Sequence, residues 1–161
     1  MTLDGIPFRT MDGETQTLRG DYDGKLVMIV NVASRCGLAP QYETLERLQR
    51  EYGDRGFQVI GFPSNQFLQE LRSNDAIIEF CSKTYGISFP VLDRIRVNGR
   101  QEHPLYTELK KTPDASGKAG RVTWNFEKFL VTPDREVIRF RPHTEPDDPA
   151  VISALEANLP G

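Results

Sequence analysis

Two apolar runs constrain the fold of this chain more than any other feature. The first, KLVMIVNVA, spans Lys25–Ala33, and the second, FQVIGFPS, spans residues 57–64. Each is nearly continuous and of strand length, which is typical of a strand buried on both faces of a sheet. Between the two runs, apolar residues recur at helical spacing: Tyr42, Leu45, Leu48 and Tyr52. A strand, a helix and a second strand in this order predict a central parallel pair.

The rest of the chain continues the alternation of helices and strands. SNDAIIEFCSKTYG begins with Ser73 as a cap candidate and predicts a helix with one apolar face, formed by Ile77, Ile78, Cys81 and Tyr85. HPLYTELKK predicts a short helix, and FEKFLVTPDREVIRFR predicts two strands around the turn at 132–135. The segment 145–161 predicts a final helix. We therefore expect an α/β fold with a mixed central sheet, in one domain covering residues 1–161.

Composition excludes several classes of function. The net charge of -3 comes from well-mixed positive and negative residues, which argues against a nucleic-acid partner. The longest apolar run is too short to cross a bilayer, so we expect no stable membrane insertion. The first residues carry no apolar segment typical of a secretory signal, and we expect a cytoplasmic enzyme or binding module. The two cysteines and two histidines lack the spacing of a zinc site, so no metal or cofactor is expected.

Cys36 lies just after the first predicted strand, where the next helix is expected to begin. Reaction sites of open α/β sheets cluster at this edge, and a helix N-terminus offers N–H groups that favour a thiolate. Arg35 can add a cation, and Gly37 leaves room for a substrate to reach the sulfur. The alternative is a buried structural cysteine in a strand-to-helix turn. The polar neighbours Ser34 and Arg35 favour the functional interpretation.

The remaining candidate residues have simpler interpretations when each is taken alone. Cys81 shares an apolar helical face and is predicted to be a core residue. Trp124 and Asn125 are hydrogen-bond donors that could stabilise an anion, but taken alone they are better explained as a core indole and a turn asparagine. His103 and His143 are predicted to be structural or solvated.

Taken together, these stretches resemble the glutathione peroxidase family over nearly the whole chain. The motifs are, in order, IVNVASRCG, QYETLERL, VIGFPSNQF, SNDAIIEFC, YGISFPVL, HPLYTELK and WNFEKFLV. The resemblance implies a thioredoxin-like α/β fold, with a central mixed β-sheet flanked by helices and an N-terminal β extension. It also implies a peroxidase that reduces hydrogen peroxide and organic or lipid hydroperoxides in the response to oxidative stress.

The active site of the family is a tetrad of selenocysteine or cysteine, glutamine, tryptophan and asparagine. By motif, Cys36 corresponds to the peroxidatic residue, and Trp124 and Asn125 to the pair in WNF. The family glutamine follows NQF within QEPGSN. Here NQFLQELRSN is one residue shorter, with leucine and arginine in place of proline and glycine. Gln69 is the first candidate for this glutamine and Gln66 the second.

Further details resemble the cysteine-type, monomeric, thioredoxin-dependent branch found in bacteria and plants. Ser64 stands where many relatives carry a cysteine, and the segment between HPLYTELKK and TWNF is short. That branch carries a resolving cysteine on the helix after NQF, which is where Cys81 lies. The resemblance therefore reverses the interpretation of Cys81 from core to resolving residue. We expect Cys36 and Cys81 to be far apart when reduced, and the Cys81 helix to open on oxidation.

Three other functions remain open at this point. The first is a glutathione-dependent peroxidase with one active cysteine, in which Cys81 is core. The second is a peroxide sensor that passes oxidation to a partner protein. The third is a thioredoxin-fold binding module with inert cysteines.

Overall fold

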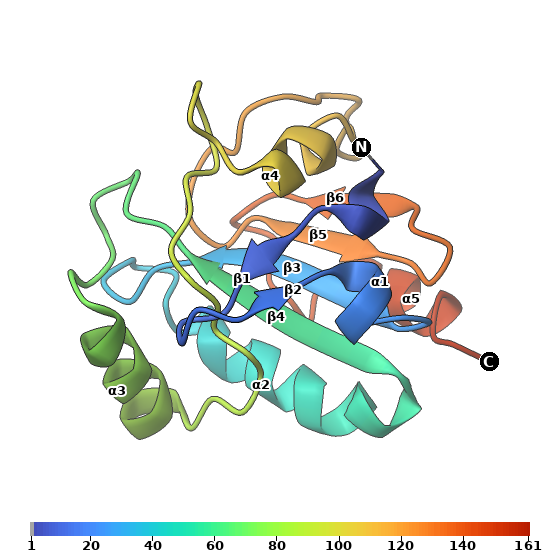
Figure 1. Ribbon diagram of the computed structural model, residues 1–161. Helices are drawn as coiled ribbons and strands as arrows, with labels where there is room; N and C mark the ends of the chain where they lie inside the picture. Colours follow the sequence, from blue (N-terminus) through green and yellow to red (C-terminus); the bar gives the residue numbers. More distant parts are fainter. Residues whose placement is uncertain (1) are drawn as a thin grey trace.

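The central feature of the fold is a four-stranded mixed sheet (Figure 1). The computed structural model describes residues 2–161. Strands β3 (Leu26–Val32) and β4 (Phe57–Pro63) are parallel, while β5 (Lys128–Val131) and β6 (Val137–Phe140) add antiparallel pairs in the order β4-β3-β5-β6. The two apolar runs of the sequence are thus neighbours, and the predicted parallel pair and mixed sheet are confirmed.

Strand β3 is apolar on both faces because it lies between two hydrophobic cores. All seven of its residues are buried. Leu26, Met28 and Val30 contribute to one core, and the alternate residues Val27 and Ile29 contribute to the other. Successive side chains of a strand point to opposite faces, so the near-continuous run supplies both cores at once.

The helices are divided between the two cores. Helices α2 (Gln41–Tyr52), α3 (Asn74–Tyr85) and α5 (Pro149–Ala157) contribute to the core of Leu26, and α1 (Leu18–Asp21) and α4 (Pro104–Leu109) to the other. The sheet is therefore covered on both faces, as Figure 1 shows. Two short 3-10 helices accompany them, at Leu3–Gly5 and Gly53–Arg55.

An N-terminal hairpin extends the fold beside α1. Strands β1 (Phe8–Arg9) and β2 (Thr15–Gln16) pair antiparallel as a separate small sheet. Phe8 is buried and packs edge-to-face on Phe62 of β4, with ring centroids 5.5 Å apart. This contact anchors the hairpin to the second core and confirms the expected N-terminal β extension.

Helix α3 matches its predicted limits but not all of its predicted apolar face. The Ser73 side chain caps it by accepting from the N–H of Ala76 at 3.1 Å. Ile77 and Cys81, one turn apart, are buried, whereas Ile78 is 49 % exposed, so its expected place on the core face is wrong. Because 3.6 residues complete a turn, Ile78 lies about 100° around the helix from Ile77. It therefore falls outside the narrow buried face formed by Ile77 and Cys81.

A buried ion pair joins Arg139 of β6 to Glu127, the residue just before β5. The Arg139 guanidinium contacts the Glu127 carboxylate at 2.5 Å, and both side chains are fully buried. Arg139 also donates to the backbone oxygens of Gly120 at 2.7 Å and Thr112 at 3.1 Å. The pair therefore fixes the loop that precedes Trp124 against the sheet.

No helix within residues 2–161 combines the length and the apolar character needed to cross a membrane.

Replacing Arg139 by methionine tests how much this ion pair stabilises the fold. Arg139→Met leaves the buried Glu127 without its main partner, and we expect the free energy of unfolding to fall by about 3 kcal/mol. Urea unfolding at neutral pH measures the loss. Arg47→Met is the matched control, because the Arg47–Asp147 pair is largely exposed and should cost less than about 1 kcal/mol. Equal losses in the two variants would show that the buried pair stabilises the fold no more than the exposed pair does.

Candidate active site

Cys36 lies in the turn that follows β3, and two N–H groups point at its sulfur. The indole Nε1 of Trp124 is 3.1 Å from Sγ, and the backbone nitrogen of Leu38 is 3.3 Å from it. Helix α2 begins only at Gln41, so the expected helix N-terminus at the cysteine is wrong. The turn supplies the backbone donor instead. Such donors stabilise an anionic sulfur more than a neutral thiol.

The Cys36 turn is bound to the loop after β4. The backbone N–H of Arg35 donates to the carbonyl of Gln69 at 2.7 Å, while the Arg35 side chain is exposed. The backbone of Gln69 is therefore held against Arg35, the residue that precedes Cys36. Its side chain is half-buried and forms no hydrogen bond with any described residue.

Gln66, the second candidate, is engaged elsewhere. Its amide nitrogen donates to the carbonyl of Asn98 at 2.9 Å, and its amide oxygen accepts from the N–H groups of Val97 and Asn98. Asn98 in turn binds both backbone groups of Val122, two residues before Trp124. Gln66 thus supports the loop that carries the tryptophan, and the assignment of Gln69 to the tetrad stays a prediction.

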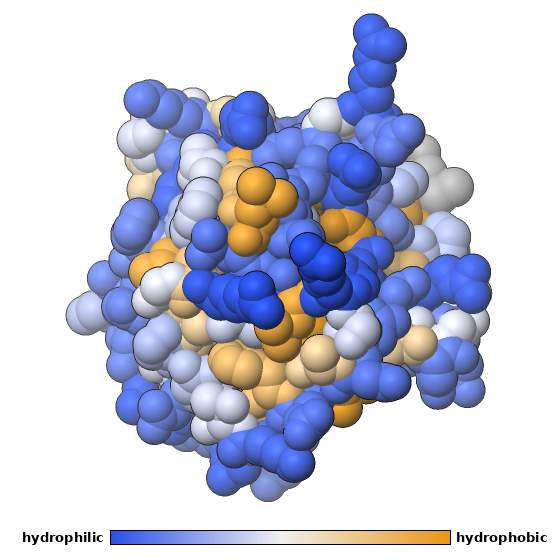
Figure 2. All heavy atoms as spheres, turned by 90° about the vertical axis from the view of Figure 1, so that its left-hand side faces the viewer, coloured by the Kyte–Doolittle hydropathy of each residue, from blue (hydrophilic) through white to orange (hydrophobic). Residues whose placement is uncertain are grey.

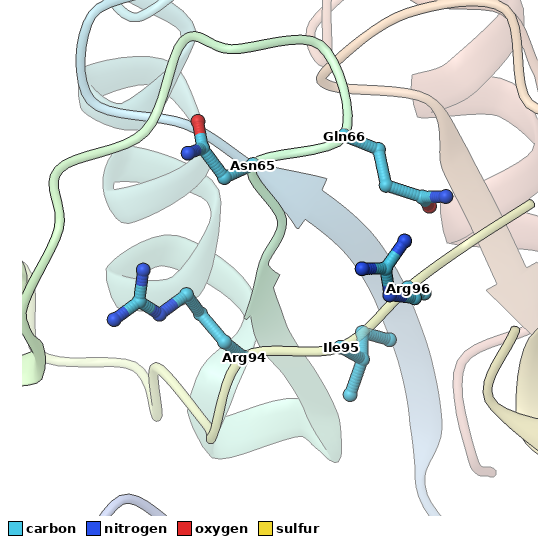
Figure 3. A pocket seen from close by; sticks show the side chains of 5 residues that line it. All are labelled: Asn65, Gln66, Arg94, Ile95 and Arg96. Carbon is cyan, nitrogen blue, oxygen red and sulfur yellow. The ribbon is translucent and has the colours of Figure 1, made fainter. Parts of the chain in front are cut away.

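A hollow of about 390 Å³ lies on the outer side of Gln66 (Figure 3). Asn65, Gln66, Arg94, Ile95 and Arg96 line it. Figure 3 shows the guanidinium of Arg96 turned toward the Gln66 side chain, with Arg94 on the other side of the hollow. Neither Cys36 nor Trp124 belongs to this lining, so the hollow adjoins the candidate site without containing the sulfur.

Asn31 holds the backbone around Trp124. Its amide nitrogen donates to the carbonyl of Trp124 at 3.1 Å, and its amide oxygen accepts from the N–H of Glu127 at 3.1 Å. The N–H of Phe126 also donates to the Asn31 carbonyl at 2.6 Å, although Phe126 has a left-handed φ of 66°. Non-glycine residues adopt this conformation at a cost in energy, so these three hydrogen bonds stabilise a strained turn.

Asn125 is fully buried beside Trp124, and neither atom of its side-chain amide has a hydrogen-bond partner among the described residues. Buried amides are nearly always paired, and an exception needs an explanation. The Asn125 amide therefore keeps its capacity to donate a hydrogen bond to another group.

Cys81 lies on α3 and is a buried, free thiol, as is Cys36. Burial raises the pKa of Cys81 to about 11; the Tyr42 hydroxyl opposes this rise and the Glu70 carboxylate adds to it. Cys81 is therefore a neutral thiol in the closed fold. The expected large separation of the two cysteines stays a prediction.

Apolar side chains continue outward from Trp124 to the surface. The ring of Phe67 packs on the indole with centroids 5.1 Å apart. The next residue, Leu68, is 81 % exposed and has a left-handed φ of 59°. Figure 2 shows the face at the left of Figure 1, where apolar patches lie between strongly hydrophilic side chains. An exposed leucine in a strained conformation next to a site is an unusual feature of a soluble protein.

Sequence reasoning missed three polar residues that the structure places around the site: Asn31, Tyr42 and Glu70. Asn31 had a detectable signal, because it is a polar residue inside the run LVMIVNV, and a buried amide must find partners. His103, expected to be structural, caps α4 by accepting from the N–H of Leu105 at 3.1 Å.

Comparisons with known proteins identify the family of this chain. Residues 6–110 match the family model described as "Glutathione peroxidase". A glutathione peroxidase of Lactococcus lactis is 48 % identical, over 86 % of this chain and 88 % of its own length. The "Thioredoxin/glutathione peroxidase BtuE" of Escherichia coli is 44 % identical, over 94 % and 93 %. A "Hydroperoxy fatty acid reductase" of Synechocystis is 40 % identical, over 91 % and 90 %.

Solved structures support the same family and fold. The crystal structure of T. cruzi GPX1 superimposes with a TM-score of 0.77 at 29 % identity, covering 100 % of this chain and 98 % of that one. A thioredoxin family protein from Chlorobium tepidum has a TM-score of 0.60 at 20 % identity, over 93 % and 92 %, which shows the thioredoxin-like fold alone. With the family model, the identities and the Cys36–Trp124 contact in agreement, the chain belongs to the glutathione peroxidase family and is a peroxidase.

Proposed function

We propose that this chain is a thiol peroxidase in which Cys36 reduces the peroxide, Cys81 resolves the oxidised cysteine, and thioredoxin recycles the enzyme. The observation that carries the proposal is the 3.1 Å contact between Trp124 Nε1 and Cys36 Sγ. A tryptophan that only filled the core would not need to direct its indole N–H at a cysteine. An indole N–H directed at a sulfur does stabilise a thiolate ready for attack.

In the first step, the Cys36 thiolate attacks one oxygen of the peroxide. The S–O bond forms while the O–O bond breaks, and the second oxygen leaves as hydroxide or alkoxide, which takes a proton from solvent to give water or alcohol. Negative charge moves from sulfur to the leaving oxygen during this step. The free amides of Asn125 and Gln69 are the proposed donors to that oxygen, and Trp124 and Leu38 hold the sulfur.

In the second step, the Cys81 thiol attacks the Cys36 sulfenic acid, forming a disulfide and releasing water. Thioredoxin then reduces this disulfide by thiol exchange, oxidising its own two thiols. Cys36 is 4 % exposed and Cys81 is 3 % exposed, so neither sulfur is open to a protein reductant in the closed fold. We therefore propose that α3 opens after oxidation.

Several observations support the choice of substrates and reductant. Phe67 and exposed Leu68 offer an apolar surface next to Trp124, suited to the alkyl part of an organic or lipid hydroperoxide. The name of the Synechocystis relative points to the same class. The second cysteine and the name of the Escherichia coli relative favour thioredoxin. Two free thiols suit a reducing compartment, so we propose a cytoplasmic, monomeric enzyme.

Peroxide turnover with two reductants in parallel tests the proposal as a whole. Wild type, Cys36→Ser and Cys81→Ser are each assayed with thioredoxin and with glutathione. We expect turnover by the wild type with thioredoxin, none by Cys36→Ser, and a loss of thioredoxin-coupled turnover of at least about tenfold in Cys81→Ser.

Other results of the same assay would support the alternative functions. Cys81→Ser with full turnover on glutathione would identify a peroxidase with one active cysteine. Poor turnover of the wild type with both reductants, together with a stable mixed disulfide to a partner, would identify a sensor.

Trp124→Phe tests the indole donor. The substitution keeps an aromatic ring against Phe67 and removes the N–H, so we expect kcat/KM for hydrogen peroxide to fall about 10²-fold. Stopped-flow oxidation of the enzyme gives this rate. Tyr52→Phe is the control, because it removes one hydrogen bond, to Glu156, far from Cys36. A Trp124→Phe rate within twofold of wild type would contradict a catalytic role for the indole.

Asn31→Ala tests the support of the tryptophan. It leaves the Trp124 carbonyl and the Glu127 N–H unpaired, and we expect a loss of about 2 kcal/mol in stability. Because Trp124 loses its fixed position, alkylation of Cys36 by iodoacetamide at pH 7 should also slow by severalfold. Asn158→Ala, which removes a hydrogen bond to the Ala154 carbonyl, is the control. A destabilised Asn31→Ala whose Cys36 reacts at the wild-type rate would limit Asn31 to a structural role.

A further inference from the structure

The hollow beside Gln66 is lined by two arginines, Arg94 and Arg96, and by no acidic residue of the described chain (Figure 3). Neither arginine forms an ion pair with any residue in 2–161. The carboxylates nearby are engaged outside the hollow. Asp93 accepts from the backbone N–H of Arg94, and buried Glu70 accepts from backbone N–H groups of the Cys36 turn and its own loop. The hollow therefore carries a net positive charge.

The two guanidinium groups differ in how firmly they are held. Arg94 donates to two neutral acceptors of the loop after β4, the carbonyl of Leu71 at 3.2 Å and that of Arg72. Arg96 is exposed, and its side chain donates to no residue that the structure describes. Figure 3 shows its guanidinium turned toward Gln66, across the hollow from Arg94. A guanidinium has five N–H donors, so both arginines keep donors for a ligand.

The walls of the hollow are held together by hydrogen bonds. The backbone N–H of Ile95 donates to the carbonyl of Pro63 at 3.0 Å. The side-chain oxygen of Gln66 accepts from the N–H groups of Val97 and Asn98, at 2.5 and 3.0 Å. The segments 63–66 and 94–98 are thus bonded to each other on both sides of the hollow. A preformed cavity of about 390 Å³ is of the size that binds part of an organic ligand.

An apolar path leads from the hollow to the sulfur. Ile95, which lines the hollow, and Phe67 pack against the same hydrophobic core. Phe67 follows Gln66 in the chain and lies on the indole of Trp124, with centroids 5.1 Å apart. The indole N–H in turn donates to Cys36 Sγ at 3.1 Å. The order from the surface inward is therefore two cations, two apolar side chains, the indole and the reacting sulfur.

We propose that the hollow is a subsite for the carboxylate of a hydroperoxy fatty acid, and that Arg96 is the residue that selects this substrate. The inference rests on the proposed function and adds the contact made by the end of the substrate remote from the hydroperoxide. Arg96 binds the carboxylate through two parallel N–H···O bonds, and Arg94 adds a second positive charge. The alkyl chain crosses Ile95 and Phe67, and the hydroperoxide group reaches Cys36.

The chemistry of the hollow fits a fatty acid better than a small inorganic anion. A planar guanidinium matches the two oxygens of a carboxylate, and the apolar side chain of Ile95 lies next to the cations where the first carbons of the chain would follow. Contacts with a remote part of a substrate can hold its reacting group in place. An uncharged ester of the same chain would lose the contact with Arg96 and keep the others.

Oxidation of the reduced enzyme by linoleic acid hydroperoxide and by the methyl ester of that hydroperoxide tests the subsite. Stopped-flow measurement gives the second-order rate constant for each, without any reductant, at low ionic strength and at concentrations where both are monomeric. We expect the acid to react at least about tenfold faster than the ester in the wild type. In Arg96→Gln the ratio of the two rates should fall close to one. A ratio cancels any change in reactivity that the two substrates share.

Two further variants and a salt series sharpen the test. Arg96→Lys keeps the charge but loses the planar fork, so its ratio should lie between those of wild type and Arg96→Gln. Arg100→Gln is the matched control, because it removes the same charge from an exposed arginine that does not line the hollow, and it should keep the wild-type ratio. Added salt should slow the acid and not the ester. Because Arg96 is exposed and unbonded, its variants are expected to fold.

A wild-type ratio near one, or a wild-type ratio retained in Arg96→Gln, would overturn the subsite. Glutathione-coupled turnover distinguishes the other source of a carboxylate. If Arg96→Gln lowered that turnover while keeping the wild-type ratio of acid to ester, the hollow would bind the reductant, and the proposal would be wrong. An enzyme whose Cys36 is oxidised by neither hydroperoxide nor by hydrogen peroxide would instead contradict the proposed function. The two failures are therefore distinct.

Discussion

The hydrogen bond from the Trp124 indole to the Cys36 sulfur joins two segments that are 88 residues apart in the chain. The geometry of this hydrogen bond depends on the point at which strands β3 and β5 stop pairing. Their ladder ends at Val30, and the next residue, Asn31, continues the connection with its side chain and its carbonyl. Because Asn31 is fixed by the register of the sheet and binds the backbone around Trp124, it sets the position of the indole. The rest of the candidate site is arranged around that contact.

A second set of hydrogen bonds, at Glu70, holds the turn that carries Cys36. There a carboxylate accepts from backbone N–H groups of the Cys36 turn and of the loop that carries Gln69. Asn31 and Glu70 are both buried, and a hydrogen bond is electrostatically stronger in such surroundings than in water. The donors around Cys36 are therefore in place before any peroxide arrives, which is the arrangement that stabilises charge in a transition state most effectively.

Much of this could be read from the sequence, and the failures have a common physical cause. The strands β3 and β4, the helix α3 with its Ser73 cap, and the cysteine at the end of β3 follow from local pattern and chain direction. The catalytic interpretation of the tryptophan was preferred over a core role only through the family resemblance. Asn31, Tyr42 and Glu70 owe their importance to partners distant in the chain, which periodicity does not register. Ile78 was misplaced because spacing fixes a face of a helix but not its width.

Both cysteines are buried, so the proposed resolving step needs an element that opens, and the packing favours one helix for it. Helices α2 and α3 have twelve residues each, but α2 buries six of them and α3 only two, Ile77 and Cys81. The free energy needed to open a segment grows with the apolar surface that it buries, so α3 costs less to release than α2. One of its two buried residues is Cys81, the thiol that the proposed resolving step would draw out of the core. Under that proposal, the reaction of Cys81 would also remove one of the contacts that keep α3 closed.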